Sequence, residues 1–226
     1  DAAGYAINRA RVRVLSSPTP EKALEFFLGE KQDPKLAGDL GTEYGIALVR
    51  MELGQFREAR ALFQGLLATN PGIIPFHTGL AGAELALGDR DAAFAAYEKA
   101  MGLFPRNTPL TVRYAEALLA AGQPKKAHAI LLDLLNNVPP TAEQVRLIAL
   151  AASAAGDTAD AHYYMAELHL LRGDVIMAAD QLRLALSIPG LDSVQKARFT
   201  SRLAEIQEWL DRELRGRRQQ AAGGQQ

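Results

Sequence analysis

The segment AGAELALGDRDAAFAAYEKAMGLFP, residues 81–105, contains two apolar runs that are separated by Gly88 and closed by Pro105. The glycine and the proline recur every 34 residues, at Gly54, Gly88, Gly122 and Gly156 and at Pro71, Pro105 and Pro139. A small and a bulky position recur with them, at Ala59, Ala93, Ala127 and Ala161 and at Phe63, Tyr97, Leu131 and Met165. A period of this length is typical of helix–turn–helix repeats that stack into a solenoid. We therefore predict an all-α protein whose function lies in a long open surface.

The recurring glycines and prolines end the helices for physical reasons. A glycine after the first helix can adopt the left-handed conformation that ends a helix without a steric cost, and the Asp that follows Gly88 can cap the next helix. Proline ends the second helix because it lacks the N–H group and its ring clashes with the preceding turn. Thr141 with Gln144 predicts a capping box at the start of a first helix.

These signals predict about twelve helices and no strand. The expected parts are an N-terminal helical pair over 1–33, which is a degenerate repeat or a cap, a repeat array over 34–190, a C-terminal capping helix over 191–218, and a disordered tail over 219–226. Gly173 follows Gly156 by half a period, so the helix over 158–172 is expected to belong to two hairpins at once.

Composition excludes several functions. The formal charge of −1 argues against a nucleic-acid partner, and the absence of cysteine excludes a disulfide framework. The longest uncharged run is interrupted by Pro71 and Pro75, so we expect no transmembrane segment. The chain begins with Asp1 and not with Met, and we expect it to be a processed form or a part of a longer protein.

The repeat positions resemble one family in particular. Two adjacent runs follow the tetratricopeptide pattern of small residue, glycine, small residue, aromatic and proline: Ala47, Gly54, Ala59, Phe63 and Pro71, then Ala81, Gly88, Ala93, Tyr97 and Pro105. The pattern also places an aromatic residue just after the glycine, as at Phe56, and later repeats depart from it there, with Pro124 and Thr158. The resemblance implies a right-handed superhelix in which the first helices line a concave face that binds proteins or peptides.

Candidate contact residues lie on those first helices and on the aromatic pair Tyr163-Tyr164. The predicted partner-binding groove consists of Tyr44, Leu48, Thr78, Arg113, Glu116, Arg146, Tyr163 and Tyr164. The alternative for each of these residues is packing between repeats. A clamp for a C-terminal carboxylate is not expected, because the inward positions hold no Lys or Asn and Glu116 would repel the ligand.

A narrower resemblance covers most of the chain. It rests on the run His162–Glu167, on Gly173-Asp174 and Gln181-Leu182, on Ala197-Arg198, and on N-terminal Tyr5, Arg9 and Arg11 with the segment Tyr44–Leu48. This pattern is similar to the repeat tail of the BepA-type periplasmic zinc metalloproteases. That family implies a periplasmic location, a catalytic domain ahead of the repeats, and work on misassembled outer-membrane proteins and their assembly machinery, with the chain's own protease domain as a further partner.

The chain departs from that family in one respect. No histidine is followed by Glu, so the HExxH zinc helix is absent and this chain is not expected to be an enzyme. No cofactor is expected in it, since zinc belongs to the missing catalytic domain. His162 and His169 lie ~10 Å apart along a helix, too far to share one zinc ion. The alternative function is a free-standing scaffold with unrelated partners, which would remove the reason for a periplasmic location and favour the cytoplasm.

Overall fold

The computed structural model describes residues 2–36 and 38–223, with side chains up to residue 212. These residues form twelve α-helices and no strand, which confirms the predicted all-α fold. The chain divides into two compact units, one ending at Tyr114 and one beginning at Ala115.

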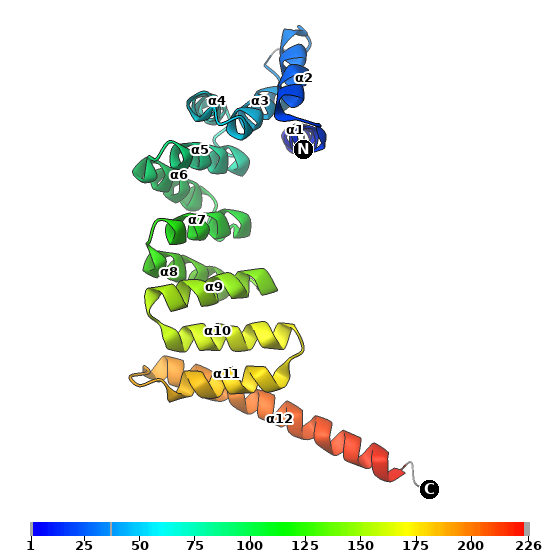
Figure 1. Ribbon diagram of the computed structural model, residues 1–226, viewed down its shortest axis with the longest axis vertical. Coiled ribbons are helices and arrows are strands. Elements are labelled where there is room, and N and C mark those ends of the chain that lie inside the picture. The colour runs from blue at the N-terminus through cyan, green and yellow to red at the C-terminus, as the bar shows by residue number, and fades with distance from the viewer. Residues whose placement is uncertain (1, 37, 224–226) are drawn as a thin grey trace. The chain divides into compact units, whose positions relative to one another are not determined.

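The first unit stacks its helices in chain order from α3 onward (Figure 1). Its helices are α1 (Ala2–Ser16), α2 (Pro20–Gln32), α3 (Leu40–Glu52), α4 (Phe56–Thr69), α5 (Ile74–Ala86), α6 (Arg90–Leu103) and the beginning of α7 (Thr108–Ala120). Starts of equivalent helices lie 34 residues apart, as at Leu40 and Ile74, so the sequence period is the period of the structure.

The second unit contains the end of α7 and the remaining helices. They are α8 (Pro124–Leu135), α9 (Ala142–Ala155), α10 (Thr158–Leu171), α11 (Val175–Ser187) and α12 (Ser193–Gly223). Helix α10 packs against both α9 and α11, as expected for a helix shared between two hairpins. The prediction ended the last helix at residue 218, but α12 continues to Gly223; the rest of the predicted tail, 224–226, lies outside the described residues.

The predicted turn glycines all have positive φ angles. They are Gly54 (72°), Gly88 (83°), Gly122 (74°), Gly156 (85°) and Gly173 (80°). After Gly88, the Asp89 side chain accepts the backbone N–H of Ala92 at 3.0 Å, and the capping box of Thr141 and Gln144 is present. The helix ends are therefore set locally, as the sequence pattern predicts.

We expect Gly88→Val to destabilise the protein more than Ala92→Val. A side chain at positive φ costs about 1–2 kcal/mol, and β-branching adds to the strain, whereas valine in a helix costs roughly 0.7 kcal/mol. Urea unfolding followed by circular dichroism measures the difference. Equal losses for the two variants would contradict the left-handed turn at Gly88.

Aromatic rings of one helix fill the space that glycines leave on a neighbouring helix. A Cβ atom on Gly45 would lie 2.3 Å from the Phe27 ring, and a Cβ atom on Gly79 would lie 2.3 Å from the Phe63 ring. The two glycines are 34 residues apart, so the same fit is used at two successive junctions. Arg113 takes the next equivalent position, where Tyr97 instead stacks on the ring of Tyr114 at 5.0 Å.

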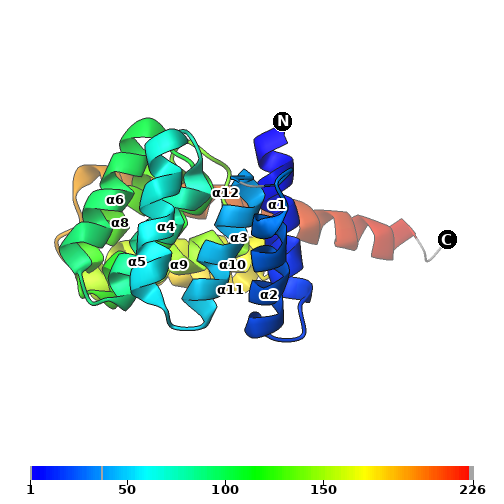
Figure 2. The same cartoon turned by 90° about the horizontal axis from the view of Figure 1, so that it is seen from above.

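The helix α1 does not pair with its successor as the helices of a repeat do. It packs along α3 and makes only marginal contact with α2 (Figure 2). The backbone of Ala6 approaches Gly41 so closely that a Cβ atom there would lie 2.7 Å from the Ala6 carbonyl oxygen. Arg9 holds this arrangement through ion pairs with Glu30 at 2.9 Å and Asp39 at 3.2 Å. The face of α3 that a partner was expected to reach is therefore covered by α1.

Candidate binding site

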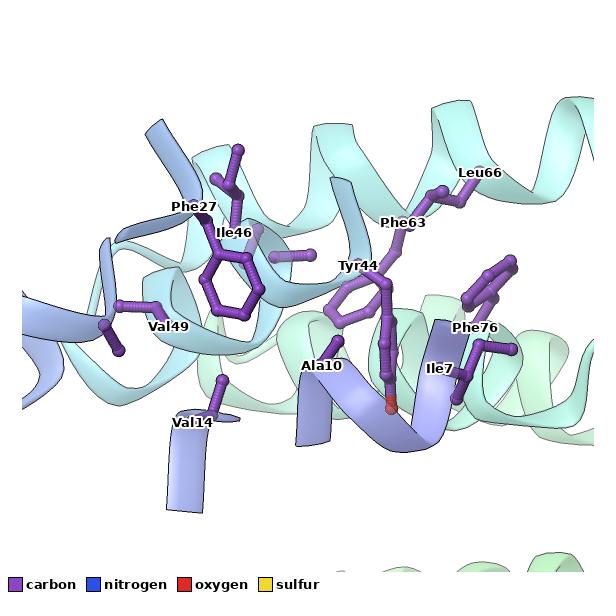
Figure 3. Close-up of a cluster of buried hydrophobic side chains, with 13 residues drawn as sticks. Ile7, Ala10, Val14, Phe27, Tyr44, Ile46, Val49, Phe63, Leu66 and Phe76 are labelled. Atoms are coloured by element: carbon purple, nitrogen blue, oxygen red, sulfur yellow. The ribbon is translucent and has the colours of Figure 1, made fainter. Parts of the chain in front are cut away.

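Tyr44 is a core residue and not a surface contact. Its side chain is 3% exposed, and its ring lies 6.3 Å from that of Phe63 and 5.3 Å from that of Phe76. Figure 3 shows Ile7 and Ala10 of α1 beside it. Burial raises the pKa of the Tyr44 hydroxyl, while the charges of Arg11 and Arg113 act in the opposite direction. The prediction that Tyr44 contacts a partner is wrong for this structure, because α1 folds over its face.

The other predicted residues of the first unit differ in accessibility. Leu48 is half-buried against the same core, and the hydroxyl of half-buried Thr78 donates to the carbonyl oxygen of Pro75 at 3.1 Å. Arg113 is exposed on α7. Of the four predicted residues here, Arg113 is thus the one whose side chain is open to solvent.

In the second unit, Glu116 and Arg146 are also exposed. The Arg146 guanidinium binds Glu143 one turn earlier, with Nε donating to Oε2 at 3.2 Å. That hydrogen bond and the charge of Arg146 lower the pKa of Glu143. Arg146 therefore already has a carboxylate partner that an incoming ligand would have to replace.

Tyr163 and Tyr164 help to line a hollow of about 390 Å³ in the second unit, which we call the tyrosine pocket. Its walls come from the end of α8 and the connection to α9, from α9, from α10 and from α12. The lining side chains are mostly apolar: Leu135, Pro139, Pro140, Val145 and Leu171, joined by Asn136, Glu167, Arg198 and the two tyrosines. Of the predicted residues, the structure brings this pair together in one site.

The two tyrosines have different roles in the pocket. Tyr164 is buried, with its ring edge-on to that of Tyr163 at 5.2 Å. Tyr163 is half-buried, stacks on Phe199 at 5.2 Å, and carries the Arg198 guanidinium 4.4 Å from its ring centre. Burial raises the pKa of both hydroxyl groups, so both are neutral at physiological pH and can donate a hydrogen bond.

A buried carboxylate that sequence reasoning missed fixes the position of Arg198. Asp160 is 4% exposed and accepts hydrogen bonds from Nη2 of Arg198 and, at 3.2 Å, from Nε2 of Gln195. His128 lies 3.6 Å away. Burial acts to raise the pKa of Asp160, but the nearby His128 ring, the charge of Arg198 and the hydrogen bond from Gln195 outweigh it and lower the pKa. The only signal in the sequence was the presence of Arg198 in the run that resembles the protease tails.

A second pair also joins α12 to α10. Arg202 donates from Nε and Nη2 to the two carboxylate oxygens of Glu167, at 2.7 and 2.9 Å. Such a bidentate pair fixes orientation as well as distance. Together with Asp160 and Arg198, it makes the α10–α12 wall of the pocket a preformed surface.

His162 and His169 each contact a polar side chain within the fold. Nδ1 of His162 lies 2.8 Å from the Gln181 side-chain oxygen on α11, and His169 lies 3.6 Å from Asp174. Within the part of the chain that the structure describes, no three His, Cys, Asp or Glu side chains are grouped to hold a metal ion. Over the same residues, no helix combines the length and apolarity needed to cross a bilayer.

Comparison with known families agrees with the helical hairpins. Residues 42–72 and 84–151 each match a family model described as tetratricopeptide repeat. These two segments thus carry tetratricopeptide repeats, a class of repeat whose stacked hairpins provide surfaces for binding other proteins.

One group of curated relatives extends this assignment. The chain is 29% identical over 170 residues to the Beta-barrel assembly-enhancing protease of Escherichia coli K12, and equally to that of Shigella flexneri. The match covers 75% of this chain and 35% of the relative, so the chain spans about a third of the length of these proteins. The repeat region described above therefore resembles one part of a larger protease.

Solved structures show the same fold at low identity. The MamA protein has a TM-score of 0.55 at 14% identity, covering 84% of this chain and 97% of its own. A tetratricopeptide repeat protein from Parabacteroides merdae has a TM-score of 0.53 at 14% identity, covering 88% and 83%. These likenesses support the architecture alone.

Proposed function

We propose that this chain is the partner-binding and regulatory module of a periplasmic zinc metalloprotease that acts in the assembly and quality control of outer-membrane proteins. The similarity to the Beta-barrel assembly-enhancing protease supports this assignment. Zinc and the peptidase chemistry would belong to a catalytic domain outside this chain, and the residues described here would hold protein segments.

The tyrosine pocket is the observation that carries the proposal. It lies within the region that resembles the protease tails, and its α10–α12 wall is fixed by two charged pairs. Leu171, 55% exposed, and half-buried Tyr163 both line the pocket from α10. A site with apolar walls and a few fixed polar groups is the usual form of a peptide or ligand pocket.

The chemistry favours an extended segment with one apolar side chain. That side chain would pack on the apolar lining next to Leu171, and would gain roughly 25 cal/mol for each Å² of apolar surface removed from water. The Tyr163 hydroxyl and the Asn136 amide can donate to the backbone carbonyl groups of the segment. Glu167 is occupied by Arg202, so the pocket does not select for a basic partner.

Site-specific photocrosslinking in the full-length parent protein tests the proposal. A photoreactive residue at Leu171 should crosslink to outer-membrane proteins or their assembly factors several-fold more than one at Leu184, an α11 leucine of similar exposure, 46%, outside the pocket. Tyr163→Ala should reduce the Leu171 crosslinks. Equal yields at the two positions would contradict a role for the pocket, and crosslinks only to proteins unrelated to the outer membrane would favour a general scaffold.

A further inference from the structure

A second hollow lies in the first unit, between α1 and α2. Its volume is about 530 Å³, and it exists because α1 packs along α3 and leaves the side of α2 open. Tyr5 and Val12 of α1 line one wall, and Phe26 of α2 lines the other. We call this hollow the N-terminal cleft.

The apolar character of the cleft comes from an additional stripe on α1. Ile7, Ala10 and Val14 are buried by α3, whereas Tyr5 and Val12 are 73% and 63% exposed. Tyr5 and Val12 are seven residues apart, two helical turns, and so lie on one face of α1. A grouped apolar surface of this kind, open on a monomer, marks an interaction site more often than isolated surface residues do.

The charges of the cleft have one sign. Its charged lining side chains are Arg9 and Arg13. Arg9 is engaged by Glu30 and Asp39, but the Arg13 guanidinium lies over the Phe26 ring, 3.9 Å from its centre. Among the described carboxylates, none comes within ion-pair distance of Arg13. An uncompensated guanidinium beside an apolar wall is complementary to a carboxylate that accompanies an apolar side chain.

We propose that the N-terminal cleft docks an acidic amphipathic helix of a partner protein. The helix would insert an apolar side chain between Val12 and Phe26, and would pair an Asp or Glu one turn away with Arg13. A helix suits the site because α2 packs on α3 but makes only marginal contact with the helix before it, whereas α4 and α6 each pack closely on the preceding helix; a docked helix would supply the missing neighbour. The concave, two-walled form of the cleft favours a helix over a flat lipid surface.

Fluorescence anisotropy with a synthetic probe tests the proposal on the full chain. The probe is a labelled amphipathic peptide with a leucine face and flanking glutamates, and it is compared with the same peptide carrying glutamine at those positions. The acidic probe should bind, and the glutamine probe should bind about tenfold more weakly. Val12→Asp should weaken the acidic probe about tenfold or more, as expected for a central apolar contact.

Matched variants separate docking from general effects. Val194→Asp alters a valine of 72% exposure on α12, and Arg57→Glu alters an exposed arginine on α4; both should bind like the wild type. Arg13→Glu should weaken binding of the acidic probe and should allow a probe with flanking lysines to bind. Tyr163→Ala should leave this binding unchanged, so failure here is distinguishable from failure of the tyrosine pocket.

Three outcomes would overturn the proposal. They are no binding of the acidic probe by the wild type, equal effects of Val12→Asp and Val194→Asp with unchanged helicity, and Val12-dependent sedimentation with phosphatidylglycerol vesicles in the absence of peptide binding. The last outcome would assign the cleft to a membrane surface.

Discussion

Replacing Gly79 by alanine should lower the free energy of unfolding by about 1–3 kcal/mol, whereas Gly82→Ala on the same helix should be neutral or stabilising by up to ~1 kcal/mol. The methyl group on Gly79 would lie 2.3 Å from the ring of Phe63, which is fully buried, so the ring or the backbone would have to shift within the core. At Gly82 the nearest atom, Cε of Met51, is 3.7 Å away, an ordinary contact. Both substitutions gain the same helix propensity, so their difference reports the packing alone.

Urea unfolding of both variants and a double-mutant cycle with Phe63→Leu measure this packing. The smaller leucine makes room for the methyl group, so Gly79→Ala should cost less in the Phe63→Leu background than in the wild type. A Gly79→Ala variant as stable as Gly82→Ala would show that Phe63 does not occupy this space.

Replacing Asp160 by asparagine should cost about 3–5 kcal/mol at neutral pH, because it leaves the Arg198 guanidinium without its buried counter-charge. Asp180→Asn is the matched control: Asp180 also pairs with an arginine, Arg183, but both side chains are more than half exposed, and the expected loss is about 0–1 kcal/mol. Urea unfolding at pH 7 compares the two. Similar losses would mean that the Asp160 cluster does not hold α12 in place.

The pH dependence of the Asp160→Asn effect has a defined sign. The pKa of Asp160 is lowered in the folded state, so its ionised form contributes stability above the ordinary pKa of about 3.9, and that contribution is lost as pH falls through the folded pKa. The difference in unfolding free energy between wild type and Asp160→Asn should therefore be constant from pH 7 to about 5 and shrink below pH ~4. A difference that grows with acidity would contradict an ionised Asp160.

Local and periodic features were predictable from the sequence. The left-handed turn at Gly88 and the cap at Asp89 depend on residues within one turn of each other, and the 34-residue spacing repeats them. That Tyr163 and Tyr164 lie at one site was also predictable, because they are consecutive residues of one helix. Which of the two is buried depends on α12 and was not predictable.

Features that depend on packing between distant segments were not predictable. Tyr44 has the repeat position of a groove residue, and the docking of α1 on α3 covers it together with the rings of Phe63 and Phe76. Asp160 occupies an unremarkable first-turn position, and its burial depends on Arg198, 38 residues later in the chain. Neither contact has a local signal, because each is made by a helix that departs from the regular hairpin pattern.

The shared fit of Phe27 into Gly45 and of Phe63 into Gly79 makes the α3–α4 hairpin an interchangeable module. A tandem copy of residues 40–73 inserted after residue 73 would present a glycine to each preceding phenylalanine, so the lengthened array would keep both junctions. The same insertion beyond α6 would fail, since Tyr97 is matched to Tyr114 and not to a glycine. The copy of Tyr44 would have no α1 packed over it, so the lengthened protein would expose an aromatic surface that α1 covers in the natural chain.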